Sequence, residues 1–250
     1  ACREKGSVFS ATIAMTIPEI AEACEQMRRL LPPEGAHTIF NKGEIARREP
    51  LVIFEAQLPT VVADDEGVLR PTARNTAIEL HEPLPGEEAT IYELGIPVVA
   101  TGDRYHVNVL QKVPLNMDRD NVTPSYLRTV RTLVLNHTSV FLKPDDVGAP
   151  WVNEALGDKR VAPQAVAKVI KERFGDKAVS FDPSDQEANH RAAGLGFNVI
   201  PGGTFPKEAW SNIRDAKALL PAGRVFPTPK PYSDDPTAPQ VTLLDKKDWT

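Results

Sequence analysis

The sequence has 250 residues, of which 41% are hydrophobic and 25% are charged, as in an ordinary globular protein. Its formal net charge of −5 argues against nucleic acid as the main partner, because binding to phosphate needs a basic face. No apolar run reaches the roughly 20 residues that span a bilayer, and no signal peptide is recognisable. We therefore expect a cytoplasmic protein with no membrane partner, whose two cysteines, Cys2 and Cys24, are reduced, with Cys24 buried on a helix face.

The first elements are predicted by side-chain pattern and by helix capping. Residues 7–15 have the composition of a strand. Thr16 and Glu19 then form a capping-box pattern at the start of a helix over residues 17–31. One face of this helix carries the apolar residues Ile20, Cys24, Met27 and Leu31 at helical spacing.

The next region is predicted to be a sheet with helices on one side. Residues 36–40 and 44–48 flank the turn Asn41-Lys42-Gly43, in which glycine can adopt a positive φ. Thr123 and Pro124 begin a helix that runs to about Asn136. Further strands are expected at 51–58, 73–81, 96–100 and 105–113, with a short helix at 89–94. This arrangement indicates an α+β layer.

The second half of the chain is predicted to form a smaller module. A linker over residues 143–160 leads to elements in the order helix, strand, helix, strand, helix, which indicates a small parallel α/β unit. These elements are a helix over 163–174, a strand over 178–182, a helix capped by Asp185, a strand over 196–200 and a helix over 206–219. We divide the chain into an α+β domain (1–145), a small α/β module (146–222) and a Pro-rich extended tail (223–250).

Few residues form a recognisable chemical motif. Five histidines are scattered without the spacing of metal ligands, so no metal site is predicted. Gln111 and Lys112 lie at the end of a predicted strand, where a lysine can reach out to a phosphate or can simply be exposed.

A second candidate site lies in the small module. Ligands of parallel sheets bind at the carboxyl ends of the strands, so Asp182, Asp185 and the turn Gly202-Gly203-Thr204 are expected to line a crevice there. Backbone N–H groups of that turn could hold a phosphate, and the alternative is an ordinary turn that begins a helix.

The segment from Tyr105 to Pro114, YHVNVLQKVP, with the loop and the helix after it, resembles the transducer domain of GHKL-type ATPases. That superfamily includes MutL proteins, type II topoisomerase ATPase subunits and Hsp90. The likeness covers roughly residues 6–140, mostly as an order of elements, and it implies a ribosomal S5 domain 2-like fold. Residues 6–15 resemble the last strand of the nucleotide-binding domain, so residues 1–145 would hold the end of a GHKL-like domain and the transducer-like domain. It also implies that Lys112, with Gln111 beside it, is the catalytic lysine that contacts the γ-phosphate of ATP.

The nucleotide-binding motifs of that superfamily do not occur in the sequence, including the Asp-x-Gly-x-Gly motif. The resemblance therefore implies that ATP and Mg²⁺ are cofactors only when a nucleotide-binding domain is supplied by a preceding segment or by a partner chain. Alone, the chain is expected not to hydrolyse ATP. It begins at Ala1 without an initiator Met, so both a processed start and a piece of a longer protein stay open.

The leading hypothesis is a transducer-like module that couples nucleotide state to an effector module. One alternative is a non-enzymatic assembly subunit of a larger bacterial or viral complex, in which the Pro-rich tail docks on a partner. The partner could also be a second copy of the chain, in a homo-oligomer. Another alternative is a small-molecule enzyme that uses the C-terminal α/β module.

Overall fold

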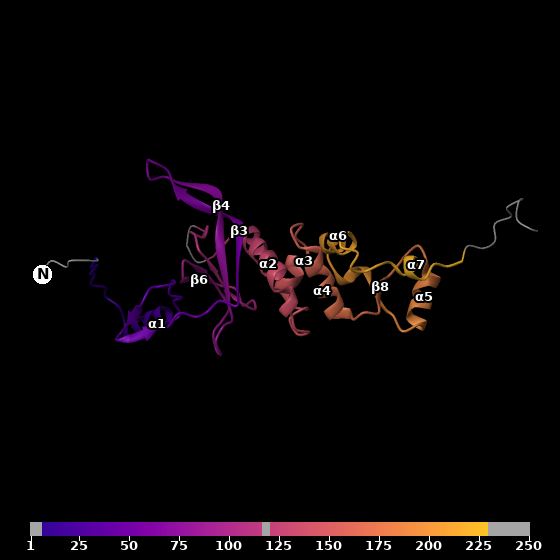
Figure 1. Ribbon diagram of the computed structural model, residues 1–250, viewed down its shortest axis with the longest axis horizontal. Coiled ribbons are helices and arrows are strands. Elements are labelled where there is room, and N and C mark those ends of the chain that lie inside the picture. Colours follow the sequence, from indigo (N-terminus) through magenta and orange to yellow (C-terminus); the bar gives the residue numbers. More distant parts are fainter. Residues whose placement is uncertain (1–6, 117–120, 230–250) are drawn as a thin grey trace, which may run out of the picture.

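The computed structural model describes residues 7–116 and 121–229. Its N-terminal helix, the sheet, the helices after the sheet and the C-terminal unit lie roughly in that order along the long axis (Figure 1). The first helix, α1, spans Ile17–Arg28. The capping box is confirmed, because the Thr16 N–H donates to Glu19 Oε2 at 2.6 Å and the Glu19 N–H donates to Thr16 Oγ1 at 3.5 Å. The helix ends at Arg28, three residues before the predicted end.

A short antiparallel hairpin follows α1. It consists of β1 (Thr38–Phe40) and β2 (Gly43–Ile45). Asn41 and Lys42 both have positive φ angles, 48° and 68°, which is the backbone conformation of a two-residue hairpin turn. The predicted hairpin is therefore confirmed at its turn, although its strands are shorter than expected.

The centre of the molecule is a five-stranded mixed sheet in the order β3-β4-β7-β5-β6. Strand β5 runs parallel to β7, and all other neighbours are antiparallel. The far ends of β3 and β4 project from the sheet as an arm (Figure 1). The strands are β3 (Val52–Ala63), β4 (Leu69–His81), β5 (Thr90–Glu93), β6 (Ile96–Ala100) and β7 (His106–Val109).

The predicted helix at 89–94 is wrong, because this segment is the strand β5. Its first three residues, Thr90, Ile91 and Tyr92, are all buried between neighbouring strands. Threonine, isoleucine and tyrosine all favour a pleated, half-buried surface. The turn after the strand is made by Leu94 and Gly95, both at positive φ.

Helix α2 (Pro124–Thr138) packs on one face of the sheet. Helices α3 (Pro150–Leu156) and α4 (Pro163–Phe174) pack against α2, farther from the sheet (Figure 1). Helix α2 begins as predicted, with Thr123 Oγ1 accepting from the Tyr126 N–H. The expected linker over 143–160 is only partly a linker, because α3 lies within it. Pro150 starts this helix, and Trp151, Val152, Ala155 and Leu156 are buried.

The C-terminal unit pairs two short parallel strands, as predicted. Its elements are β8 (Ala178–Ser180), α5 (Gln186–Gly194), β9 (Asn198–Ile200), the 3-10 helix η2 (Gly202–Thr204), α6 (Lys207–Asp215) and α7 (Ala222–Val225). The N-cap of α5 is Asp185, as expected. The fold is therefore a mixed α+β arrangement followed by parallel α/β pairing.

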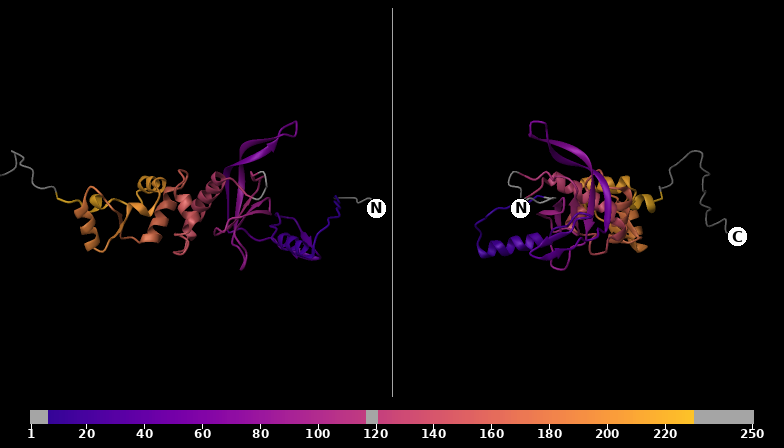
Figure 2. Two further views of the ribbon diagram at one scale, coloured as in Figure 1. Left: turned by 180° about the vertical axis from the view of Figure 1, so that it is seen from behind. Right: turned by 60° about the vertical axis from the view of Figure 1, so that its left-hand side comes forward.

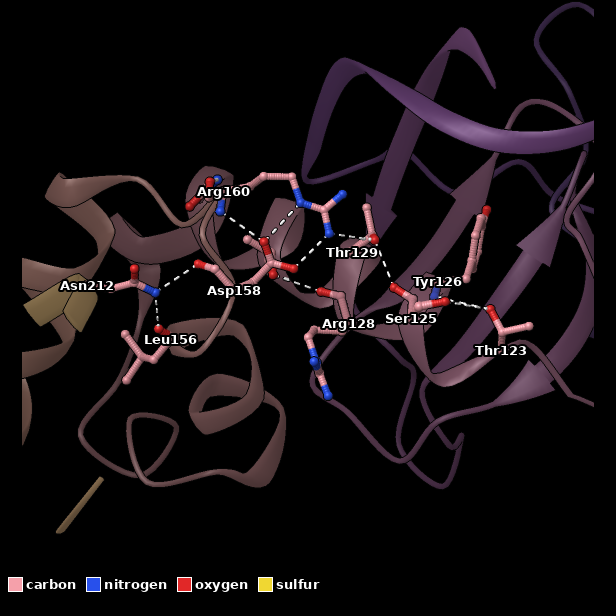
Figure 3. Close-up of polar contacts among 11 residues, drawn as sticks. Thr123, Ser125, Tyr126, Arg128, Thr129, Leu156, Asp158, Arg160 and Asn212 are labelled. Carbon is pink, nitrogen blue, oxygen red and sulfur yellow. Dashed lines mark hydrogen bonds and ion pairs between the residues drawn. The ribbon is translucent and has the colours of Figure 1, made fainter. Parts of the chain in front are cut away.

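One hydrophobic core extends from Phe54 in β3 through the helices to Leu219 after α6. A polar junction ties the same parts together (Figure 3). Arg160 Nη2 donates to Thr129 Oγ1 of α2 at 2.8 Å, and Asn212 of α6 donates to the backbone oxygen of Asp158 at 2.9 Å. The core thus crosses residue 145, where the sequence analysis places a domain boundary, and that boundary stays a prediction.

The N-terminal segment differs most from expectation. Residues 7–15 form no strand, because no other segment of the described chain pairs with them. Helix α1 has no buried residue, so Cys24 is half-buried rather than buried. In Figure 2 the segment before α1 runs away from the sheet. Cys2 and residues 230–250 of the Pro-rich tail lie outside the described residues.

Candidate functional site

Gln111 and Lys112 lie just beyond β7, whose last residue is Val109 rather than the predicted 113. Three tertiary hydrogen bonds hold the segment from Gln111 to Val113, one through the Gln111 side chain and two through the backbone of Lys112 and Val113. Gln111 Nε2 donates to the Leu58 oxygen at 3.2 Å, and Thr60 Oγ1 donates to the Lys112 oxygen at 2.7 Å. The Val113 N–H donates to Glu93 Oε2 at 2.7 Å. This segment is therefore bonded to β3 on one side and to β5 on the other.

The side chain of Lys112 is exposed and has no ion pair or hydrogen bond with the described residues. Fixing the backbone removes much of the entropy that a lysine loses on binding, while its ammonium stays available. Lysine binds phosphate as a mobile point charge with three donors. The position can thus present a cation to an anionic ligand held by another body.

The loop after Lys112 is closed at its base. Leu115 and Val122 form an isolated antiparallel bridge, and the Asn116 N–H donates to the Asn121 oxygen at 2.8 Å. This base connects the end of β7 to Thr123, which caps α2. Lys112 and the first turn of α2 are therefore joined through this base.

A polar network that sequence reasoning missed lies on the sheet face opposite α2. Arg48 makes a bidentate ion pair with Glu87, at 2.6 and 2.7 Å. Glu87 also lies 3.1 Å from Nε2 of His106, which is fully buried. Arg29 Nη2 donates to Thr90 Oγ1 at 2.7 Å. The network joins the passage from α1 to β3 to the central strands, and its members are too distant in sequence to form a motif.

The hydrogen bonds of His106 define its tautomer. The Thr90 N–H donates to Nδ1 at 3.1 Å, so Nδ1 is an acceptor and the proton of the neutral ring lies on Nε2, which donates to Glu87. Burial lowers the pKa of His106, which keeps the ring neutral at physiological pH. The Arg48 hydrogen bonds lower the pKa of Glu87 to about 2. With these charge states, Glu87 is paired with both Arg48 and His106 at neutral pH.

The second predicted site is a crevice of about 260 Å³ at the carboxyl ends of β8 and β9. Asp182 and Gly202 line it, as expected. Gly203, Thr204 and Asp185 are not among its lining residues. The walls also include Phe181, Ile200, Trp210 and Arg214, of which the two from α6 were not predicted.

The two aspartates of this unit have structural roles. Asp182 Oδ1 accepts from the N–H and the hydroxyl of Ser184, which holds the pKa of Asp182 below its usual range. Asp185 accepts from the Ala188 N–H at 2.9 Å and from the Thr228 N–H at 2.9 Å, and also from the Thr228 hydroxyl. These bonds lower the pKa of Asp185. Through the bond from Ala188, the same carboxylate caps the first turn of α5.

The described residues contain no group of three or more His, Cys, Asp or Glu side chains that could hold a metal ion. Within residues 7–116 and 121–229, no helix is both long enough and apolar enough to cross a bilayer. Comparisons with protein-family models, with curated proteins and with solved structures find no match for this chain.

Proposed function

We propose that the α+β part of this chain is the transducer-like portion of a GHKL-type ATP-binding protein. In this proposal Lys112 contacts the γ-phosphate of ATP, Gln111 fixes its backbone, and the nucleotide-binding domain belongs to another segment or chain. The fold of the layer would then be of the ribosomal S5 domain 2 type. The observation that carries the proposal is that the Lys112 carbonyl is held by Thr60, while its side chain is exposed and unpaired among the described residues.

The exposed apolar residues of the N-terminal segment support the proposal that a partner carries the nucleotide-binding site. Phe9 is 92% exposed and Ile17 is 84% exposed, although both belong to an apolar pattern that normally faces a core. Val8 and Ile13 are similarly uncovered. The resemblance identifies this stretch with the end of the nucleotide-binding domain, so a body that binds ATP is the occupant that we propose for it.

The coupling route follows from the bonds around Lys112. A phosphate that draws the ammonium forward pulls on the segment that joins β7 to α2. Helix α2 is in turn bonded through Arg131 to Asp103 at 2.8 Å and to Glu154 of α3 at 2.6 Å. The state of the nucleotide would thus reach the helical part of the molecule, which serves as the path to the effector module.

The test measures ATP hydrolysis by the native protein with every segment and subunit that it has in its source. Lys112→Ala should lower kcat by roughly 100-fold, the usual cost of removing one group that stabilises transition-state charge. Lys143→Ala is the matched control, because Lys143 is also exposed but lies after α2. Normal turnover by the Lys112 variant, or no ATP hydrolysis by the native assembly, would overturn the proposal.

The same exposed apolar segment also favours the second candidate, a non-enzymatic assembly subunit. Such a protein would use Phe9 and Ile13 to bind its neighbours and would not respond to nucleotide. An assembly that forms equally well with and without ATP, and that hydrolyses none, would support this function instead.

A further inference from the structure

The crevice of the C-terminal unit lies at one edge of three parallel segments. Strands β8 and β9 end there, and Ser180 also bridges in parallel to Pro221, which starts the third segment. In open parallel sheets this edge is where ligands bind, because the chain turns away into helices and leaves a hollow. The hollow measured here, about 260 Å³, is large enough only for a small ligand.

The aromatic wall of the crevice is fixed before any ligand arrives. Trp210 Nε1 donates to the Gly202 oxygen at 2.6 Å, and the indole packs edge to face on Phe205, with ring centroids 5.5 Å apart. Phe181, which directly follows β8, is 45% exposed. An exposed aromatic beside a locked indole favours a ligand with a flat apolar part.

Two charged side chains line the crevice, Asp182 and Arg214, and no ion pair joins them. The carboxylate of Asp182 already accepts two hydrogen bonds from Ser184. Arg214 follows Trp210 by four residues, so one face of α6 presents both side chains. Its guanidinium is exposed and makes no ion pair or hydrogen bond with the described residues. Arginine stays charged and offers a planar set of donors that fits a phosphate or a carboxylate.

We propose that this crevice binds a small aromatic anion, whose ring packs between Phe181 and Trp210 and whose phosphate or carboxylate pairs with Arg214. This site is separate from the one proposed around Lys112 and does not depend on it. The carboxylate of Asp182 repels the anionic group, so the anion lies on the α6 side of the crevice.

The test titrates the protein with phenyl phosphate and follows binding by calorimetry and by tryptophan fluorescence, to which Trp210 contributes. We expect a dissociation constant of about 1 mM or tighter. Inorganic phosphate lacks the ring and benzyl alcohol lacks the charge, so each should bind at least roughly tenfold more weakly. Arg214→Gln should weaken phenyl phosphate binding by roughly tenfold, the usual effect of losing a charge-assisted hydrogen bond.

The controls separate the site from general effects of charge. Arg74→Gln removes another exposed arginine, from β4, and should leave the affinity unchanged. Phe181→Ala should weaken binding of phenyl phosphate but not that of inorganic phosphate, and circular dichroism checks that it folds. Equal affinity for phenyl phosphate and inorganic phosphate, or an unchanged affinity in Arg214→Gln, would show that no such site exists.

Discussion

Glu87 is the residue on which the buried polar network converges, because it accepts hydrogen bonds from both Arg48 and His106. Its pKa falls from 4.5 to about 2 on folding. A lowered pKa in the folded state adds stability that is present above pH 4.5 and is lost as the pH falls towards 2. The shift corresponds to about 3 kcal/mol at neutral pH.

We therefore predict that Glu87→Gln lowers the free energy of unfolding by about 3 kcal/mol at pH 7 and by little near pH 2. Urea denaturation over a series of pH values measures both effects. Glu25→Gln is the control, because the ion pair of Glu25 with Arg28 is exposed and such pairs contribute little. An equal loss at both pH values would mean that Glu87 acts through packing rather than through charge.

At the scale of elements, Gly95 determines how the chain after α1 docks on the sheet. Its φ angle is +84°, and a Cβ at this position would collide with the backbone oxygen of Leu31. The Leu31 N–H also donates to the Gly95 oxygen at 2.9 Å. The turn after β5 and the end of the α1 passage are thus in direct backbone contact, which only glycine permits.

Gly95→Ala should consequently destabilise the fold by about 3 kcal/mol or more and expose residues 29–37 to protease, because strain at positive φ adds to a backbone collision. Gly86→Ala isolates the first cause, since Gly86 has a φ of +87° and a Cβ there meets nothing within 4 Å. The Gly86→Ala variant should therefore lose only about 1 kcal/mol of unfolding free energy. Thermal unfolding and limited proteolysis of both variants decide whether the contact with Leu31 matters beyond the φ strain.

Which elements could be predicted depended on how local their causes are. The capping box at Thr16 and the turn at Asn41-Lys42-Gly43 were found because their partners lie within three residues. The strand β5 and the helix α3 were missed, since each is short and is formed by burial against distant parts. The intrinsic secondary-structure propensity of the residues is a weak guide to such short helices and strands.

The same distinction between local and distant causes applies to the candidate sites. The position of Lys112 after a strand was visible in the sequence, but Thr60, which bonds its backbone oxygen, lies 52 residues away. Glu93, which bonds the next residue, Val113, lies 20 residues from it. The crevice was predicted at the correct strand ends, yet Trp210 and Arg214 come from a helix whose orientation no local pattern fixes. Asp185 was predicted both as a helix cap and as a lining residue of the crevice, and it caps α5 without lining the crevice. The hydrogen bonds that Asp182 accepts from Ser184 were not foreseen.

At the scale of the whole molecule, the apolar side chains of some segments are buried and those of others are exposed. The main core joins the sheet to the helices up to Leu219, while Val179, Ala188, Ala192 and Ala222 form a smaller separate cluster. Residues 7–20 join neither cluster. Burial of a large apolar side chain is worth about 2 kcal/mol, so an uncovered apolar segment strongly favours association.

We predict that the isolated chain self-associates through this segment and that replacing Phe9 and Ile13 by serine prevents it. The melting temperature should change by less than about 2 °C, because neither side chain contacts the folded core, and both are at least 72% exposed. Light scattering reports the association and calorimetry reports the stability. Val140→Ser is the matched control, since Val140 is 71% exposed but lies after α2. A marked fall in melting temperature in the serine variant would instead place residues 7–15 within the fold.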